Sequence, residues 1–190
     1  MECGSSQQFR ICDTTEMLFT PLEISGAFGI SESAKTDSRG SLTRLWDVDG
    51  FLRSFELNQV SVVKNPALGT LRGLHYQEQP YSENKVVECI AGKVFDVILD
   101  LRSDSETKGK HFAIEIGPSC DFIGLFIPTG CAHGYLTRQR DSDLIYFTDK
   151  KFSSEHASGV RWNDPSLAIM WPETPLLISE RDKNWPTLNL

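Results

Sequence analysis

Short apolar or alternating runs follow one another along the chain from Pro21 onward, separated by glycine, proline, asparagine and serine. Runs of this kind are typical of β-strands joined by turns, and helical periodicity is nearly absent. The predicted strands are 22–24, 41–46, one or two strands within 51–63, the strand-like run 69–77, and then 86–90, 93–101, 111–116, 122–127, 132–137 and 143–147. Many short strands at this spacing predict an all-β sandwich or barrel.

The segments between and around these strands carry further expectations. Ala91 and Gly92 predict a tight turn, so the strands on either side are expected to pair as a hairpin. Residues 1–20 are polar and weakly patterned, and we interpret them as a loose arm or a first strand ahead of a single domain, 21–190. The tail is rich in proline and tryptophan and is expected to be ordered by packing onto the barrel. One helical turn is predicted at 153–158.

The composition fits one packed domain, with 190 residues, 39% hydrophobic and 10% aromatic. The net charge of -7 argues against nucleic-acid binding, which needs a basic face. An anionic ligand would therefore need a local cluster of positive charge.

The sequence also suggests a compartment. No run approaches the roughly 20 apolar residues of a membrane span, and the N-terminus has no pattern of a secretory signal. No membrane partner is therefore expected. The five cysteines are irregularly spaced and include no CxxC pair, which argues against a disulfide framework or a zinc site. They are expected to be reduced thiols of a cytoplasmic protein.

The most informative segment runs from Gly69 to Gln77, because it places Arg72 and His75 close together in one strand with Gly73 between them. Strict alternation would put the arginine and the histidine on opposite faces of that strand. They share a site only if the strand twists or bulges near Gly73, or if Arg72 reaches round its edge.

Later segments add Lys85, His133, Tyr146 and Asp182, a set that suits proton abstraction beside a carbonyl. Such chemistry needs a base with an orienting carboxylate, an acid on the other side of the substrate, and cations for the enolate. Taken singly, these residues have ordinary interpretations: a surface lysine, a turn histidine, a core aromatic residue and a polar loop residue.

The segment Pro128-x-Gly130-x-x-His133 resembles the second sequence motif of cupins, which are small double-stranded barrels. Metal-binding cupins also carry two histidines one residue apart in a first motif, where this chain has His75-Tyr76-Gln77. Because the whole chain has four histidines, a metal held by several imidazoles is not expected. A metal-dependent cupin oxygenase is an alternative that metal analysis would test.

These segments together resemble the dTDP-4-dehydrorhamnose 3,5-epimerase family of cupins, over nearly the whole chain from Pro21 to Pro186. The resemblance also rests on Asp37-Ser38-Arg39-Gly40, Gln59-Val60-Ser61, Gly92 to Val97, Asp100-Leu101-Arg102, Gly159 to Pro165, Trp171-Pro172 and Ser179 to Asp182. It implies a cupin double-stranded β-helix, a jelly-roll barrel, with short peripheral helices.

The resemblance implies an epimerase that inverts C3 and C5 of a nucleotide-linked 4-keto-6-deoxyhexose, through an enolate and without a cofactor. His75 matches the family's base, and Asp182 matches the carboxylate that orients it. Tyr146 matches the acid that returns a proton from the opposite face. Lys85 and Arg72 would stabilise the enolate oxygen or bind the diphosphate.

The resemblance also implies binding residues: His133 for sugar or phosphate, and Arg39, Gln59 and Arg181 for the nucleotide. In the family an N-terminal strand pairs with the partner's sheet. A homodimer with strand exchange is therefore expected, in which Arg39 would reach the partner's site.

The chain departs from the family pattern at three positions: Arg44, where an acidic residue is usual, Ala157, where another often stands, and Phe152, in place of a second tyrosine. These departures leave open the nucleotide, the sugar, and whether one or two centres are inverted. A ketoisomerase that moves the ketone between C3 and C4 is one rival. A non-catalytic sugar-nucleotide binding cupin is another.

Overall fold

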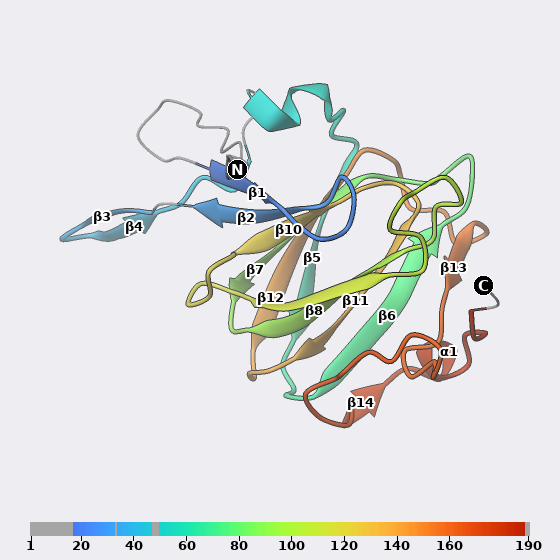
Figure 1. Cartoon of the computed structure of the whole chain (residues 1–190). Coiled ribbons are helices and arrows are strands. Elements are labelled where there is room, and N and C mark those ends of the chain that lie inside the picture. Colours follow the sequence, from blue (N-terminus) through green and yellow to red (C-terminus); the bar gives the residue numbers. More distant parts are fainter. Residues whose placement is uncertain (1–16, 33, 47–49, 189–190) are drawn as a thin grey trace, which may run out of the picture.

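The protein is nearly all-β in the computed structural model, which describes residues 17–32, 34–46 and 50–188. The first sheet contains, in spatial order, β1 (Met17–Pro21), β2 (Phe28–Glu32), β10 (Gly124–Ile127), β7 (Lys85–Ala91), β12 (Ser142–Thr148) and β5 (Gln59–Asn65). The second contains β13 (Ala157–Gly159), β6 (Thr70–Gln77), β11 (Cys131–Thr137), β8 (Val94–Asp100) and β9 (His111–Ile116), and β14 (Leu177–Ile178) pairs with β6. The pairing is antiparallel except between β14 and β6, and the predicted all-β barrel is confirmed (Figure 1).

In the described ranges, few elements lie outside the two sheets. β3 (Lys35–Asp37) and β4 (Gly40–Leu42) form a hairpin that extends away from the barrel in Figure 1. The short helices are a 3-10 turn, η1 (Gly50–Ser54), and α1 (Glu180–Lys183). Neither of these described helices has the length or the apolar character needed to cross a bilayer.

Alternating side chains build an apolar layer between the sheets and two outer layers. Val87 and Ile98 are fully buried between the sheets. Leu99, the residue after Ile98, faces the other way and packs in a cluster with Trp171 of the tail. The tail is therefore ordered by packing onto the second sheet, as the sequence predicted.

The hairpin predicted at Gly92 is wrong. β7 pairs with β10 and β12 in the first sheet, whereas β8 pairs with β11 and β9 in the second. Gly92 has a φ of 72°, and a Cβ at this position would collide with Ser142. The chain thus makes a tight crossing from one sheet to the other, which looks like a hairpin turn at the level of sequence.

Several predicted boundaries also change. Residues 22–24 form no strand, since β1 ends at Pro21 and the chain turns so that Ile24 is buried in the main core. The run 41–46 is a strand only to Leu42, and the run 51–63 overlaps most of η1 and of β5. The segment 153–158 forms a turn and the start of β13, with no helix. β1 occupies the end of the predicted arm, and residues 1–16 lie outside the described ranges.

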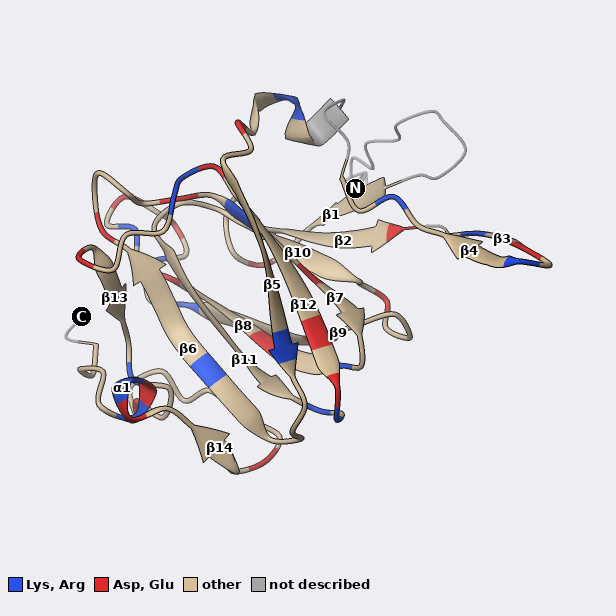
Figure 2. Cartoon of the chain, turned by 180° about the vertical axis from the view of Figure 1, so that it is seen from behind, with Lys and Arg blue, Asp and Glu red and all other residues tan. Residues whose placement is uncertain are grey.

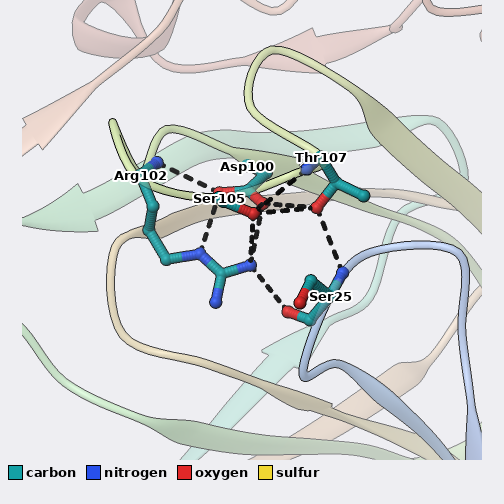
Figure 3. A network of polar contacts seen from close by, with 5 residues as sticks. All are labelled: Ser25, Asp100, Arg102, Ser105 and Thr107. Atoms are coloured by element: carbon teal, nitrogen blue, oxygen red, sulfur yellow. Dashed lines mark hydrogen bonds and ion pairs between the residues drawn. The ribbon is translucent and has the colours of Figure 1, made fainter.

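A polar network fixes the loop between β8 and β9 (Figure 3). Asp100 accepts hydrogen bonds from Ser105 Oγ at 2.5 Å, Thr107 Oγ1 at 2.6 Å and Arg102 Nη2 at 2.7 Å. Burial alone would raise the pKa of Asp100, but these donors outweigh it and lower the pKa far below its ordinary value. Arg102 Nη2 also donates to Ser25 O at 2.6 Å, so the network ties this loop to the turn after β1.

Candidate active site

A cavity of about 470 Å³ opens between the sheets, on the side where β5 is the edge of one sheet and β13 the edge of the other. β5, β7 and β12 supply one wall, β6 and β13 supply the other, and α1 with the tail closes the rim; β5, β12, β6 and α1 can be followed in Figure 2. Its volume lies within the range of about 300–1,000 Å³ that is usual for small-molecule sites.

His75 and Asp182 form a hydrogen-bonded pair on the wall of the second sheet. His75 Nε2 lies 2.6 Å from Asp182 Oδ1. Asp182 is buried, whereas 45% of the His75 side chain is exposed where it lines the cavity. Because an ionised Asp182 accepts the proton of Nε2, the lone pair is left on Nδ1, which is the tautomer that a general base needs.

Asp182 is held by more than His75. Ser179 caps α1 by accepting a hydrogen bond from Asp182 N at 3.1 Å, Trp185 Nε1 donates to Oδ1 at 3.2 Å, and Gly73 N donates to Oδ2 at 3.4 Å. Burial works to raise the pKa of Asp182, but the hydrogen bonds and the charge of His75 outweigh burial and lower it. The carboxylate is therefore ionised at neutral pH.

A bulge in β6 brings Arg72 and His75 to the same cavity. His75 pairs with His133 of β11 and Arg72 pairs with Tyr135, so β6 advances three positions while β11 advances two. Gly73 lies in this step with a φ of 120°, and a side chain there would collide with the backbone of β11. Of the alternatives that the sequence left open, the structure has the bulge, which resolves the alternation that would otherwise separate the two side chains.

Tyr146 stands on the opposite wall. It belongs to β12 of the first sheet, while His75 belongs to β6 of the second, and both line the cavity. Burial, followed by the neighbouring Tyr135 and Asp96, raises the pKa of Tyr146 well above its ordinary value. Its hydroxyl therefore keeps its proton at neutral pH and can donate it.

Lys85 forms a buried ion pair in the same cavity. Its Nζ lies 2.8 Å from Glu83 Oε1, and both side chains are less than one tenth exposed, at 8% and 7%. Gln77 Nε2 donates to the second oxygen, Glu83 Oε2, at 2.9 Å. All three residues line the cavity.

Three exposed cations also line the cavity: Arg72, Lys150 and Arg181. Arg72 Nε donates to Asn65 Oδ1 at 3.0 Å, and the Arg181 guanidinium lies 4.8 Å from the centre of the Trp185 ring. Within the described ranges none of the three has a carboxylate at ion-pair distance. Their charges are available to an anionic ligand, although the net charge of the chain is negative.

Gln59 and two of the three departures from the family pattern border the cavity as well. Gln59 Oε1 accepts a hydrogen bond from Phe152 N at 3.1 Å, and both residues line the cavity. Ala157, on β13, also lines it. These two departures therefore change the surface that a ligand would meet. Arg44 is not among the lining residues.

Two predicted site residues do not line this cavity. His133 is buried, with Nε2 at 2.9 and 2.8 Å from the two carboxylate oxygens of Asp96 and its ring 5.9 Å from the ring of Tyr146. This position suits support of Tyr146 more than direct contact with a ligand. Arg39 lies on the β3–β4 hairpin, where its side chain is 88% exposed and pairs with Asp37 at 2.6 Å.

Two histidines lie at or beside the cavity, and each contacts a carboxylate. His75 and His133 each face one carboxylate, Asp182 and Asp96. Within the described residues, no group of three or more histidine, cysteine, aspartate or glutamate side chains is placed to hold a metal ion. The expectation of a metal-free, cofactor-free protein stays a prediction.

The sequence reasoning missed several site residues, among them Trp185, Glu83, Gln77 and Lys150. Trp185 donates to Asp182, and its spacing of three residues from Asp182, about one helical turn, is a weak signal that could have revealed it. Glu83 lies in a polar loop without periodicity, so its contact with Lys85 had no signal in the sequence.

Comparison with known sequences gives a consistent match. The family model described as dTDP-4-dehydrorhamnose 3,5-epimerase matches residues 21–189. A relative from Sinorhizobium fredii, named dTDP-4-dehydrorhamnose 3,5-epimerase, is 33% identical over 177 residues, which cover 91% of this chain and 90% of the relative.

Solved structures show the same likeness. The crystal structure of dTDP-4-dehydrorhamnose 3,5-epimerase from Bacillus anthracis, with TDP and PPi bound, has a TM-score of 0.85 at 31% identity and covers 90% of this chain and 99% of that one. A 3'-monoepimerase from Streptomyces bikiniensis, in complex with dTDP-quinovose, has a TM-score of 0.80 at 29% identity and covers 88% and 86% of the two chains.

Proposed function

The chain belongs to the dTDP-4-dehydrorhamnose 3,5-epimerase family, and we propose that it inverts C3 and C5 of dTDP-4-dehydro-6-deoxyglucose to give dTDP-4-dehydrorhamnose. One observation carries the proposal: a histidine with an ionised partner and a protonated tyrosine line opposite walls of one cavity. Inversion needs this division, because a proton must leave one face of a carbon and return to the other.

In the first step His75 removes a proton from the carbon next to the C4 ketone. The hydrogen bond from Nε2 to Asp182 Oδ1 fixes the ring and stabilises the imidazolium that forms. The electron pair of the broken C–H bond moves into the ketone and gives an enolate. The ketone of the substrate is the electron sink.

In the second step Tyr146 returns a proton to the opposite face of the same carbon. Its raised pKa keeps the proton on the hydroxyl until a strong base, the enolate carbon, accepts it. The proposal assigns this step to Tyr146 because it offers a protonated hydroxyl on the wall facing the base, whereas the ammonium of Lys85 on that wall is paired with Glu83. After each inversion His75 releases its proton to water and Tyr146 takes one up from water, so that the same pair of groups can act at C3 and at C5.

The nucleotide end of the substrate would meet the exposed cations. Arg72 and Arg181 suit the diphosphate, since guanidinium groups bind phosphate oxygens in pairs. Gln59 lies on β5 at the same cavity and would contact the nucleotide. The TDP bound to the Bacillus anthracis epimerase supports a thymidine nucleotide as the ligand class.

A second candidate is inversion at one centre. The likeness to the Streptomyces bikiniensis 3'-monoepimerase favours it, because that protein matches nearly as well as the 3,5-epimerases. The same two catalytic groups serve either reaction, so the walls around the sugar decide between them. Phe152 and Ala157 are the lining residues at which this chain departs from the family pattern.

The proposed functional unit is a homodimer in which Arg39 serves the partner's site. The hairpin that carries Arg39 extends away from the barrel, and Arg39 is not among the residues lining the cavity of its own chain (Figure 1). Mixing Arg39→Ala chains with His75→Ala chains tests this. Restored activity in the mixture is expected, because one of the two sites in a mixed dimer would be intact. No restoration, with dimers seen by sedimentation, would contradict the assignment.

The experiment that tests the reaction is proton NMR of dTDP-4-keto-6-deoxyglucose in deuterated water with the purified protein. Deuterium is expected at both C3 and C5, with a product that a suitable reductase converts to dTDP-rhamnose. His75→Ala is the matched variant, and its exchange should fall by about 10²–10⁴-fold. Deuterium at one carbon would favour the single-centre reaction, and no exchange with the wild-type protein would overturn both proposals.

A further inference from the structure

We propose that Glu83 is a positioning residue that holds Lys85 for the ketone oxygen of the sugar and keeps it from the diphosphate. This inference rests on the proposed epimerase function and deepens it. It follows from a difference among the four cations that line the cavity. Three of them are exposed and have no carboxylate partner in the described ranges, and the fourth, Lys85, is buried and neutralised.

Both carboxylate oxygens of Glu83 have a partner in the cavity wall. Oε1 lies 2.8 Å from Lys85 Nζ, and Oε2 accepts a hydrogen bond from Gln77 Nε2 at 2.9 Å. Gln77 is itself fixed, because its Oε1 accepts from Ser153 N at 2.6 Å and its Nε2 also donates to Tyr81 O at 3.0 Å. The carboxylate therefore has little freedom, and it restrains the ammonium that it contacts.

The charge of the pair decides what Lys85 can serve. A buried ion pair is close to neutral overall, so it adds little attraction for a diphosphate that carries negative charge before the reaction begins. Arg72, Lys150 and Arg181 are exposed at the same cavity and keep their full charge for that group. The substrate's phosphates thus have better partners than Lys85.

The ketone oxygen makes a different demand. It is neutral in the substrate and becomes negative only as the enolate forms, so the best partner is an oriented N–H donor that is already in place. An ammonium has three N–H donors, and Glu83 occupies one of them. Lys85 lies on β7, on the same wall as Tyr146, and can direct a remaining donor into the cavity.

The test separates binding from chemistry with Glu83→Gln, which keeps the shape of the side chain and removes its charge. We expect kcat to fall about tenfold, the usual size of coupling within one ion-pair network. KM and the affinity for dTDP should stay within about twofold, since the diphosphate does not depend on this pair. Glu83→Asp keeps the charge on a shorter side chain, and its kcat should lie between those of the wild type and Glu83→Gln.

A double-mutant cycle shows whether Glu83 acts through Lys85. Lys85→Met removes the ammonium, and in that background Glu83→Gln should lower kcat no further. An unchanged kcat in Glu83→Gln, a rise in KM without a fall in kcat, or additive losses in the cycle would each overturn the proposal.

Affinity for dTDP and the melting temperature report whether each variant is folded. If Glu83→Gln does not fold, the cycle is run with Glu83→Asp. Failure of the epimerase function itself would show as a wild-type protein without exchange, before any variant is compared.

Discussion

The two faces of the first sheet give buried ionisable groups opposite environments. On the inner face of β7, Lys85 lines the cavity, and its Nζ lies 2.8 Å from Glu83 Oε1. On the outer face of the same strand, Glu88 is fully buried, and neither of its carboxylate oxygens has a hydrogen-bond partner among the residues that the structure describes. Val87 points into the main core, so alternation places Glu88 on the opposite face.

A similar contrast separates the pKa values of two buried carboxyl groups, Glu88 on β7 and Asp182 on α1. Burial first, and then the charge of Glu32, raises the pKa of Glu88 to about 9. Asp182 is also buried, yet its hydrogen bond to His75 and its N–H donors lower its pKa. Burial alone therefore does not mark a functional carboxylate in this protein. The partners that the fold supplies decide whether the group is a charged participant or a neutral core residue.

The largest expected effect comes from the inner face. Tyr146→Phe should lower epimerisation by at least about 10²-fold, because the proton returned to the enolate comes from this hydroxyl. Deuterium exchange into substrate should persist at a larger fraction of its wild-type rate, since His75 still removes the proton. Proton NMR in deuterated water measures both rates together. Equal loss of exchange and inversion would contradict the assignment of two separate groups.

The outer face is tested by Glu88→Gln, which should change stability and leave turnover unaltered. The unfolded chain loses this proton near its ordinary value of 4.5 and the folded protein near 9. Unfolding between these values therefore releases one proton, and the free energy of unfolding should fall as pH rises, by up to about 1.4 kcal/mol per unit. In Glu88→Gln this contribution should disappear, and the variant should be the more stable one at pH 8.

Urea unfolding at several pH values between 5 and 9 measures that difference. Glu56→Gln is the matched control, because it removes a carboxyl from an exposed position. Parallel pH curves for wild type and Glu88→Gln would show that Glu88 has the same proton affinity in both states. Such a result would remove the contrast between the two faces of the sheet.

The smallest expected effect compares neighbours on β5. Gln59 lines the cavity, whereas Val60 is 49% exposed on the other side of the strand. Gln59→Ala should raise KM by about 3- to 10-fold with little change in kcat, which corresponds to the loss of one or two hydrogen bonds. Val60→Ala should alter neither. Steady-state kinetics of both variants checks this, and a kcat loss in Gln59→Ala would move that residue into the chemistry.

The sequence predicted features that depend on neighbouring residues, and it failed for features that depend on contacts between distant segments. The bounds of β9 were predicted as they are observed, because local alternation and turn residues define that strand. The hairpin at Gly92 was predicted wrongly, because a glycine turn between two strands looks the same whether they pair or lie in different sheets. Residues 22–24 failed for a similar reason: an apolar run can fill the core from a turn as well as from a strand.

At the cavity the same limit applies. His75, Lys85, Tyr146 and Asp182 were chosen from sequence motifs, and the structure brings all four to one cavity. Glu83 was not chosen, because its value depends on a contact across a loop that no motif describes. The catalytic roles of His75, Lys85, Tyr146 and Asp182 stay predictions until the variants are measured.

The sequence by itself determined most of the central strands, the all-β class, the family and the residues available for proton transfer, since these depend on local patterns and motifs. Only the tertiary structure decided which strands lie side by side, that a bulge at Gly73 turns Arg72 and His75 toward one cavity, and that His75 and Tyr146 occupy opposite walls. It also decided that Lys85 has a counter-charge, while the carboxyl group of Glu88 has no hydrogen-bond partner in the described part of the chain. The physical reason is that burial and pairing depend on neighbours far apart in the chain, and those neighbours set the charge state of each buried group.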